Sequence, residues 1–185
     1  YHYLAEALAK GQTSLLVDPS EELKQLSNPY DSSLRIQEDV YYFWDFAYYK
    51  GKYFVYFGIG PELVFYLPYF LITGTHLPNP IPIMISEIFF ILGVFLFFEE
   101  IVIRYNQRKI PLGLSLLLSS ATILGSGAFF IARRPDIYSV PIMMGLALTI
   151  WGLFLWLKSR QTDHSLNCKI LFIGSCCMAF VATCR

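Results

Sequence analysis

The chain has 185 residues, of which 55% are hydrophobic and only 15% are charged, and its mean hydropathy is +0.48. This composition excludes an ordinary water-soluble domain, because a chain of this length encloses too little interior to bury so much apolar surface. Fourteen basic residues balance fourteen acidic ones, so the net charge indicates no nucleic-acid partner, and none is expected. The chain begins without methionine and ends after an apolar run, which we interpret as an internal piece of a longer protein.

Residues 1–60 are polar and rich in aromatic side chains, and we expect them to form a loop with short helices outside the bilayer. An amphipathic helix is predicted over 1–10, with Gly11 as its stop. The sequence Asn28-Pro29-Tyr30-Asp31 is typical of a turn. The aromatic segment 41–57 indicates either an aromatic belt at a membrane surface or a surface on which sugars stack.

Residues 61–80 are predicted to form a separate interfacial or re-entrant helix and a turn. The apolar run 61–73 is shorter than the roughly 20 residues that a membrane-spanning helix needs. Pro68 also removes a helix hydrogen bond near the middle of the run.

The remaining segment, 81–185, contains four long apolar runs separated by charged stretches. Each run approaches the length of a transmembrane helix, at about 1.5 Å per residue across a hydrocarbon core of about 30 Å. The predicted spans are 81–103, 110–131, 137–157 and 168–184. The predicted fold class is therefore an all-α polytopic membrane protein with about four transmembrane helices. Small residues in 119–127 further predict close helix packing in the second span.

Basic residues in the short loops predict the orientation, because such loops stay on the cytoplasmic side. Two basic loops two spans apart belong on the same side: Arg104, Arg108 and Lys109, and then Lys158, Arg160 and Lys169. Residues 1–60, Arg133, Arg134 and Arg185 are then expected outside the cytoplasm. Inside the first span, Glu99 and Glu100 are expected to pair with Arg104. Glu87 lies a turn or two inside the same span, where an ionisable group is costly and often functional, although a position near the interface would let it reach water.

The four cysteines and three histidines show no spacing typical of a metal site. We therefore predict no metal and no cofactor. The cysteines are expected to act as small packing residues within or at the start of the last apolar run.

Several segments carry a resemblance to a known family. The pattern YxYLAEALxxGQ occurs at 1–12, LxxLxNPYDxxxR at 23–35, an aromatic cluster ending in FGxxP at 45–61, and LPYxLxTGTxLPN at 67–79. These segments resemble the bacterial membrane glycosyltransferases of the GT-C superfamily, in the protein-mannosyltransferase-like group that includes the lipid A aminoarabinose transferase. The likeness covers most of the chain and is strongest over 1–80. The Lys-Pro-Pro of the better-known relatives is replaced here by Gly60-Pro61-Glu62.

This resemblance implies an enzyme of the cell membrane that moves a sugar from a polyprenyl-phosphate donor to an acceptor outside the cytoplasm. The acceptor would be a glycan, a lipid or a protein, and membrane lipids would surround the spans. The family's essential acidic residue would lie upstream of Tyr1, outside this chain, and would act as general base or orient the acceptor.

Candidate site residues follow from the chemistry of that reaction. A leaving phosphate needs cations, and the external basic candidates are Arg185, Arg133, Arg134 and Lys52. The resemblance places Arg185 after the last span and Asp136 at a second acidic position of the site. Candidates for binding the acceptor or the sugar are Asp31, Asp45 and Trp44.

Two other functions fit the same composition. A transporter or flippase of lipid-linked saccharides would need broken spans with polar groups at mid-membrane, for which only Glu87 is an indication. A non-catalytic membrane scaffold that binds envelope polymers is the second alternative.

Overall fold

The computed structural model describes residues 1–106, 111–160 and 165–184. The chain forms two compact units. We call residues 1–57 together with 64–76 the aromatic unit, and residues 58–63 together with the described residues from 77 onward the helical unit. The boundaries differ from the expected ones because α4 (Leu67–Thr73) packs against α1 (His2–Ala9), which joins the predicted interfacial helix to the N-terminal segment.

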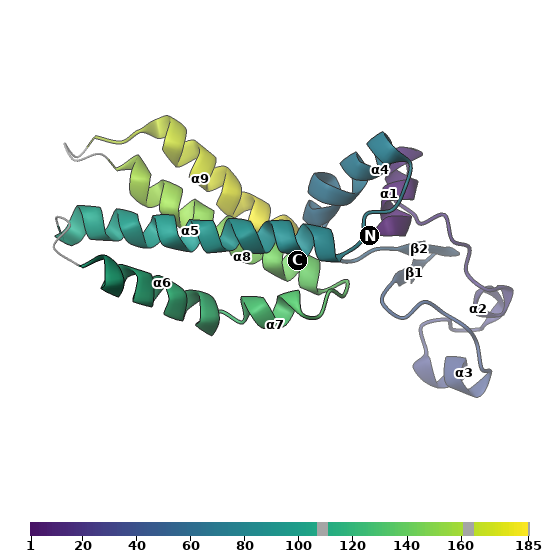
Figure 1. The fold of residues 1–185 in the computed structure, drawn as a ribbon. Helices are drawn as coiled ribbons and strands as arrows, with labels where there is room; N and C mark the ends of the chain where they lie inside the picture. Colours follow the sequence, from purple (N-terminus) through teal and green to yellow (C-terminus); the bar gives the residue numbers. More distant parts are fainter. Residues whose placement is uncertain (107–110, 161–164, 185) are drawn as a thin grey trace. The chain divides into compact units, whose positions relative to one another are not determined.

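The aromatic unit holds short elements (Figure 1). They surround a small apolar core. Its other helices are α2 (Glu21–Gln25) and α3 (Ser32–Gln37), and its strands are β1 (Ala47–Tyr49) and β2 (Lys52–Phe54). The predicted first helix and its stop are confirmed, with Gly11 in the left-handed region at φ 75°. The predicted turn is confirmed as well, since the Asp31 amide donates to the Asn28 carbonyl at 3.2 Å. The buried core is formed by Leu4, Leu15, Leu23, Val40 and Tyr53.

The aromatic segment contains a β-hairpin, so the all-α prediction is wrong there although the chain is mostly helical. Strands β1 and β2 pair antiparallel, with Tyr48 opposite Tyr53. Lys50 and Gly51 form the two-residue loop at φ 47° and 75°, which is the backbone of a type I′ turn. This turn matches the natural twist of two strands, and aromatic residues favour strands because they pack across a pair. A bridge from Ser14 to Phe54 adds a third segment to the hairpin.

We expect Gly51→Ala to destabilise the aromatic unit by about 1 kcal/mol, because alanine resists the positive φ of the turn. The measurement is thermal unfolding of the protein in detergent, followed by near-ultraviolet circular dichroism of the aromatic side chains. Gly113→Ala is the matched control, since a Cβ at this position meets open space on a helix. There the same change should be neutral or slightly stabilising. Equal effects of the two changes would contradict the I′ turn.

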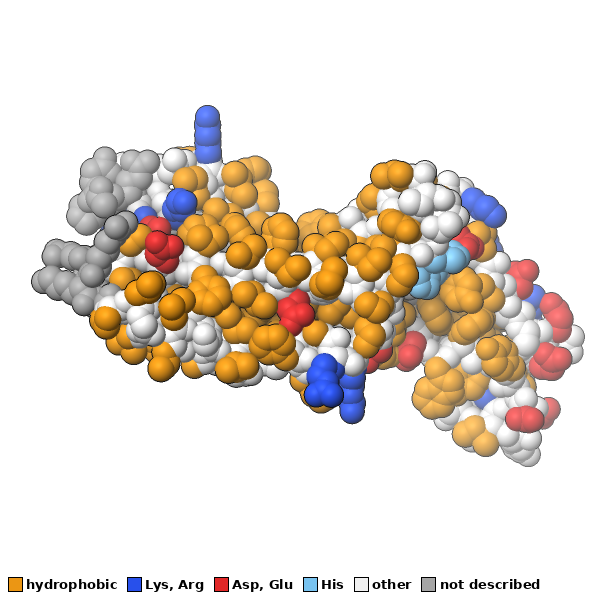
Figure 2. Space-filling view, viewed as in Figure 1, with side chains coloured by type: hydrophobic (Ala, Val, Ile, Leu, Met, Phe, Trp, Pro, Cys, Tyr) orange, Lys and Arg blue, Asp and Glu red, His pale blue; other side chains and the backbone are white. Residues whose placement is uncertain are grey.

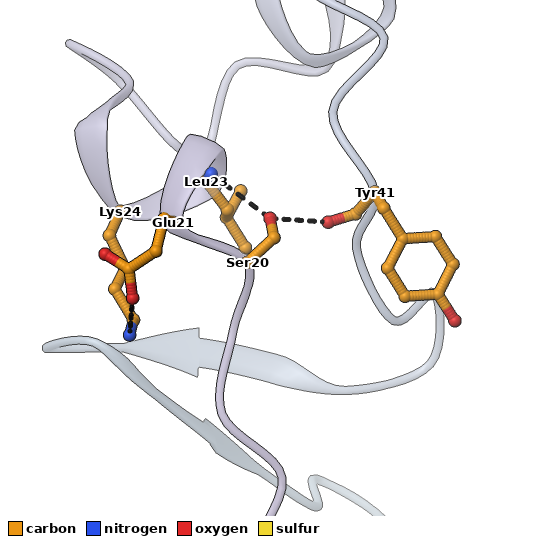
Figure 3. A network of polar contacts seen from close by, with 5 residues as sticks. All are labelled: Ser20, Glu21, Leu23, Lys24 and Tyr41. Carbon is orange, nitrogen blue, oxygen red and sulfur yellow. Dashed lines mark hydrogen bonds and ion pairs between the residues drawn. The ribbon is translucent and has the colours of Figure 1, made fainter.

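Ser20 links α2 to the start of the aromatic segment (Figure 3). Its Oγ accepts a hydrogen bond from the Leu23 amide at 3.2 Å, which caps the first turn of α2. The same hydroxyl donates to the Tyr41 carbonyl at 3.0 Å. One side chain therefore orients Leu23 toward the core and fixes where the aromatic segment begins.

The helical unit packs α8 (Ser139–Ser159) between α5 (Pro80–Asn106) and α9 (Cys168–Val181) (Figure 1). Its shorter elements are α6 (Leu112–Gly125), α7 (Ala128–Ala132) and the 3-10 turn η2 (Ala182–Cys184). A π-helical turn, η1 (Glu62–Tyr66), leads into α4 and places Pro68 in the first turn of that helix, where a missing amide hydrogen costs little.

Helices α5 and α8 run in the same direction. At one end Arg104 donates to the Lys158 carbonyl at 3.4 Å, and at the other Asn79 donates to the Pro135 carbonyl at 3.4 Å. The described residues of the two basic loops therefore lie at one end of the unit, as the alternation of spans predicted. The expected pairing of Glu100 with Arg104 is confirmed at 2.6 Å. Residues Arg108 and Lys109 lie outside the described residues.

Two of the four predicted spans have the length and composition to cross a membrane, namely Pro80–Tyr105 and Ser139–Ser159. The prediction of one helix over 110–131 is wrong, because α6 ends at Gly125 and Gly127 turns the backbone at φ 77° before α7 begins. Fourteen residues make α6 and α9 about 21 Å long, short of the roughly 30 Å of a hydrocarbon core. Figure 2 shows apolar side chains along the flank of this unit and Lys or Arg side chains toward its ends.

Close packing through glycine occurs on other helices than expected. A Cβ at Gly125 would meet nothing within 4 Å. By contrast, a Cβ at Gly93 would lie 2.6 Å from Ile150, and one at Gly174 would lie 3.2 Å from the Gly152 carbonyl oxygen. Small residues therefore bring α8 close to α5 and α9, as in membrane helix packing.

Candidate functional site

Three of the predicted site residues lie in one turn of the helical unit, between α7 and α8. Arg133, Arg134 and Asp136 are all exposed there. Asp136 Oδ1 accepts from the Ser139 amide and hydroxyl, each at 2.8 Å, and from the Tyr138 amide at 3.0 Å. The hydrogen bond from the Ser139 hydroxyl is the main cause that holds the pKa of Asp136 below its usual range. Asp136 thus anchors the start of α8 as an ionised carboxylate.

The two arginines of this turn point their charge to solvent. The Arg134 guanidinium carbon lies 5.0 Å from the centre of the Phe130 ring, a cation–π contact that orients the side chain. Within the described part of the chain, neither arginine forms an ion pair with a carboxylate. We call residues 133–138 the cationic turn; it offers two guanidinium groups at the start of a helix of membrane-spanning length.

The other predicted site residues lie in the aromatic unit, with one exception. Lys52 is exposed at the start of β2, and Trp44 is 79% exposed, with its ring stacked on Tyr42 at 5.8 Å. Asp31 caps α3 by accepting from the Ser33 hydroxyl and amide, and chiefly the hydroxyl bond lowers the pKa of Asp31. Asp45 is half-buried beside Trp44. Arg185 lies outside the described residues.

A cavity of about 290 Å³ lies within the aromatic unit. Six of its ten lining residues are aromatic, and the walls come from α2, α3, the hairpin and the segments between them: Leu23, Pro29, Tyr30, Arg35, Tyr42, Phe43, Phe46, Ala47, Tyr48 and Tyr53. Asp31 and Trp44 are not on its wall, but each is one or two residues from a lining tyrosine. The sequence predicts an aromatic surface over 41–57 but does not reveal that this segment closes on 23–35.

Arg35 is the cation among these lining residues. Its guanidinium carbon lies 4.1 Å from the centre of the Tyr42 ring, and its Nε is buried with no hydrogen-bond partner in the described structure. At the floor, Tyr53 is 2% exposed; its hydroxyl accepts from the Phe43 amide at 3.3 Å, and burial raises its pKa. The floor is therefore a buried aromatic side chain held by a hydrogen bond, with one positive group beside it.

A second cluster joins α1 to the segment around α4. His76 Nε2 lies 3.0 Å from Glu6 Oε1, and the rings of His2 and His76 are 4.9 Å apart. Burial lowers the pKa of His2. The sequence predicts no role for the histidines, since they show no ligand spacing, and only the packing of α4 on α1 brings His2 and His76 together. In the described ranges, no group of three or more acidic, histidine or cysteine side chains is placed to hold a metal ion.

Two carboxyl groups in the helical unit have buried oxygens without a hydrogen-bond partner in the described structure. Glu62 is fully buried and neither of its carboxyl oxygens has a hydrogen bond; burial raises its pKa from 4.5 to about 8. Glu87 on α5 has one buried oxygen without a partner. The sequence indicates Glu87 as a functional candidate but gives no such sign for Glu62. The position of Glu62 beside Pro61 and before an apolar run does not reveal how deeply Glu62 is buried.

We compared the chain with known proteins, and no family model, no curated protein and no solved structure matches it.

Proposed function

We propose that this chain belongs to a multi-pass membrane glycosyltransferase that moves a sugar from a polyprenyl-phosphate donor to a glycan, lipid or protein acceptor. In this proposal the enzyme lies in the cell membrane, and residues 1–60 and the cationic turn face the side away from the cytoplasm. Helices α5 and α8 would span the bilayer, and α6, α7 and α9 would complete the membrane region. The catalytic carboxylate would lie upstream of Tyr1.

The observation that carries this proposal is the cationic turn. Arg133 and Arg134 are exposed at the start of α8 without a carboxylate partner in the described structure, at the level where a lipid phosphate would lie if α8 crosses the membrane. Guanidinium groups bind phosphate oxygens through paired hydrogen bonds. Negative charge grows on the phosphate as it leaves the sugar, so such contacts strengthen in the transition state.

The aromatic unit supports the sugar side of the reaction. Its cavity presents ring faces of the kind on which sugars stack, and Trp44 exposes a further ring beside it. Asp31 and Asp45 supply carboxylates near that cavity that suit sugar hydroxyls.

One observation favours the alternative, a transporter or flippase of lipid-linked saccharides: Glu87 Oε1 on α5 is buried without a hydrogen-bond partner in the described structure. The two functions differ in one result, since only a transferase forms a new glycosidic bond.

The test is transfer of labelled sugar from polyprenyl-phosphate donors by the full-length protein in membranes. We expect Arg133→Gln/Arg134→Gln to lower transfer about 100-fold, since two phosphate contacts are lost. The matched control is Arg160→Gln/Lys169→Gln, which removes two exposed cations from the other end of the unit and should leave transfer unchanged.

In the same assay, Asp136→Asn distinguishes a structural role of Asp136 at the start of α8 from a role in sugar transfer. Asparagine keeps an oxygen that can accept from the Ser139 amide but removes the charge. A loss of transfer without loss of stability would place Asp136 in the reaction. Full transfer by the double arginine variant, or binding and translocation of the donor without any transferred sugar, would refute the proposed function.

A further inference from the structure

The cavity of the aromatic unit has the composition of a binding site for one small charged group. Its volume of about 290 Å³ lies just below the range for ligand pockets, about 300–1,000 Å³. This size suits a single sugar ring better than an extended polymer. The rings of Tyr30 and Tyr48 lie 6.2 Å apart, and Tyr30 is 62% exposed at the edge of the unit, so the wall on this side is open to an incoming ligand.

Arg35 is the charged side chain among the residues that line the cavity. No acidic side chain lines the cavity, and Arg35 forms no ion pair with any carboxylate of the described structure. Asp31, four residues before Arg35, instead holds its carboxylate on Ser33. A buried N–H donor without an acceptor is costly, and an anionic oxygen from a ligand would satisfy the Arg35 Nε.

The Arg35 side chain is also held in place before any ligand binds. The guanidinium rests against the Tyr42 ring at 4.1 Å, which limits the rotation of a long side chain before any ligand binds. Tyr42 is in turn stacked against Trp44 at 5.8 Å with an interplanar angle of 24°. An entirely apolar ligand would fill the cavity but would leave the Nε unpaired, so apolar ligands are disfavoured.

From these observations we propose that the cavity binds an acidic saccharide residue. The carboxylate or phosphate of that residue accepts hydrogen bonds from Arg35, and its ring stacks against the aromatic wall. Binding of a saccharide in this cavity does not require sugar transfer, so the binding proposal can be tested separately from the proposed enzyme activity. The site deepens that function by assigning an acidic sugar to the aromatic unit.

The experiment is isothermal titration calorimetry of the full chain in detergent micelles with three probes. These are a disaccharide that ends in glucuronic acid, the same disaccharide ending in glucose, and glucose 6-phosphate. We expect the glucuronic acid probe to bind at least about 10-fold tighter than the glucose probe, because it adds a charge-assisted hydrogen bond. Comparison with glucose 6-phosphate then decides between a carboxylate and a phosphate.

Four variants test the residues. Arg35→Gln should remove the preference for acidic probes and leave the weak glucose affinity unchanged, while Arg35→Lys should retain part of it. Tyr30→Ala at the exposed edge should weaken all probes alike. Lys10→Gln, which removes an exposed cation of the same unit away from the cavity, should change nothing.

Thermal unfolding of each variant shows whether it is folded, and the Tyr30 and Lys10 variants keep the test valid if Arg35→Gln does not fold. The proposal is overturned if none of the probes binds, or if acidic and neutral probes bind equally. It is also overturned if a folded Arg35→Gln protein keeps the preference for acidic probes.

Discussion

Replacing Gly174 by alanine is expected to destabilise the helical unit by about 2–3 kcal/mol, the usual cost of overfilling a packed contact. A Cβ at this position would lie 2.8 Å from Trp156 Cδ1, 3.0 Å from Leu155 Cβ and 3.2 Å from the Gly152 carbonyl oxygen. Two of these three neighbours belong to the backbone or to its first side-chain atom, so they cannot move without moving α8. The helices must therefore separate, and the hydrogen bond from Trp156 Nε1 to Ser175 Oγ, 3.1 Å long, is strained with them.

The measurement is the free energy of unfolding in detergent micelles, followed by far-ultraviolet circular dichroism. Gly125→Ala is the matched control, because its added Cβ meets nothing within 4 Å and it lies at the end of α6. That change should be neutral or stabilising by up to about 1 kcal/mol. If both variants unfold at the same midpoint, α8 and α9 do not cross at Gly152 and Gly174.

The second large effect is a loss of stability as the pH rises, caused by Glu62. Burial raises the pKa of this carboxyl from 4.5 to about 8 in the folded protein. Between these two values the folded state holds a proton that the unfolded chain has released. The free energy of unfolding therefore falls as the pH rises from about 4.5 to about 8 and levels off above that range. The full shift corresponds to at most about 5 kcal/mol, at about 1.4 kcal/mol per pKa unit.

Glu62→Gln should remove most of this pH dependence and stabilise the protein above pH 8, because glutamine stays neutral at every pH. The measurement is the midpoint of thermal unfolding in detergent at pH 5, 7 and 9. Glu38→Gln, at an exposed position, should leave the dependence as it is in the unchanged protein. A Glu62→Gln protein whose stability still falls between pH 5 and pH 9 as steeply as that of the unchanged protein would show that Glu62 is ionised in the fold.

Much of the local structure follows from the sequence because its causes are local. Gly11 ends α1, and the Asn28–Asp31 turn forms, since both depend on the backbone preferences of a few neighbouring residues. Helices α5 and α8 follow from runs of apolar residues, and the side-by-side ends near Arg104 and Lys158 follow from the alternation of the spans. The pairing of Glu100 with Arg104 is a contact across one helical turn and is predictable for the same reason.

The hairpin and the broken second span were accessible in principle but were missed. Lys50-Gly51 between aromatic runs is a weaker turn signal than Asn-Gly, and the density of aromatic residues concealed the alternation typical of strands. In the second span, the sequence predicts Gly125 and Gly127 as packing residues, whereas Gly127 supplies a positive φ that ends α6. The sequence does not distinguish a glycine that packs against a neighbouring helix from one that adopts a positive φ. Only the backbone conformation of the glycine and its neighbours in the structure distinguish these two roles.

The sequence by itself determined a membrane-like composition and four apolar runs with arginines between them, and the structure showed that two of these runs form helices of spanning length. Only the tertiary structure decided that Arg35 shares a cavity with Tyr42 and Tyr48, that Gly152 meets Gly174, and that Glu62 is buried without a partner. Composition and periodicity depend on the free energy of each residue in water or lipid, which is a local quantity. Cavities, close approaches and burial depend on which distant segments pack together. The amino-acid type of a residue does not show which distant residue it will contact.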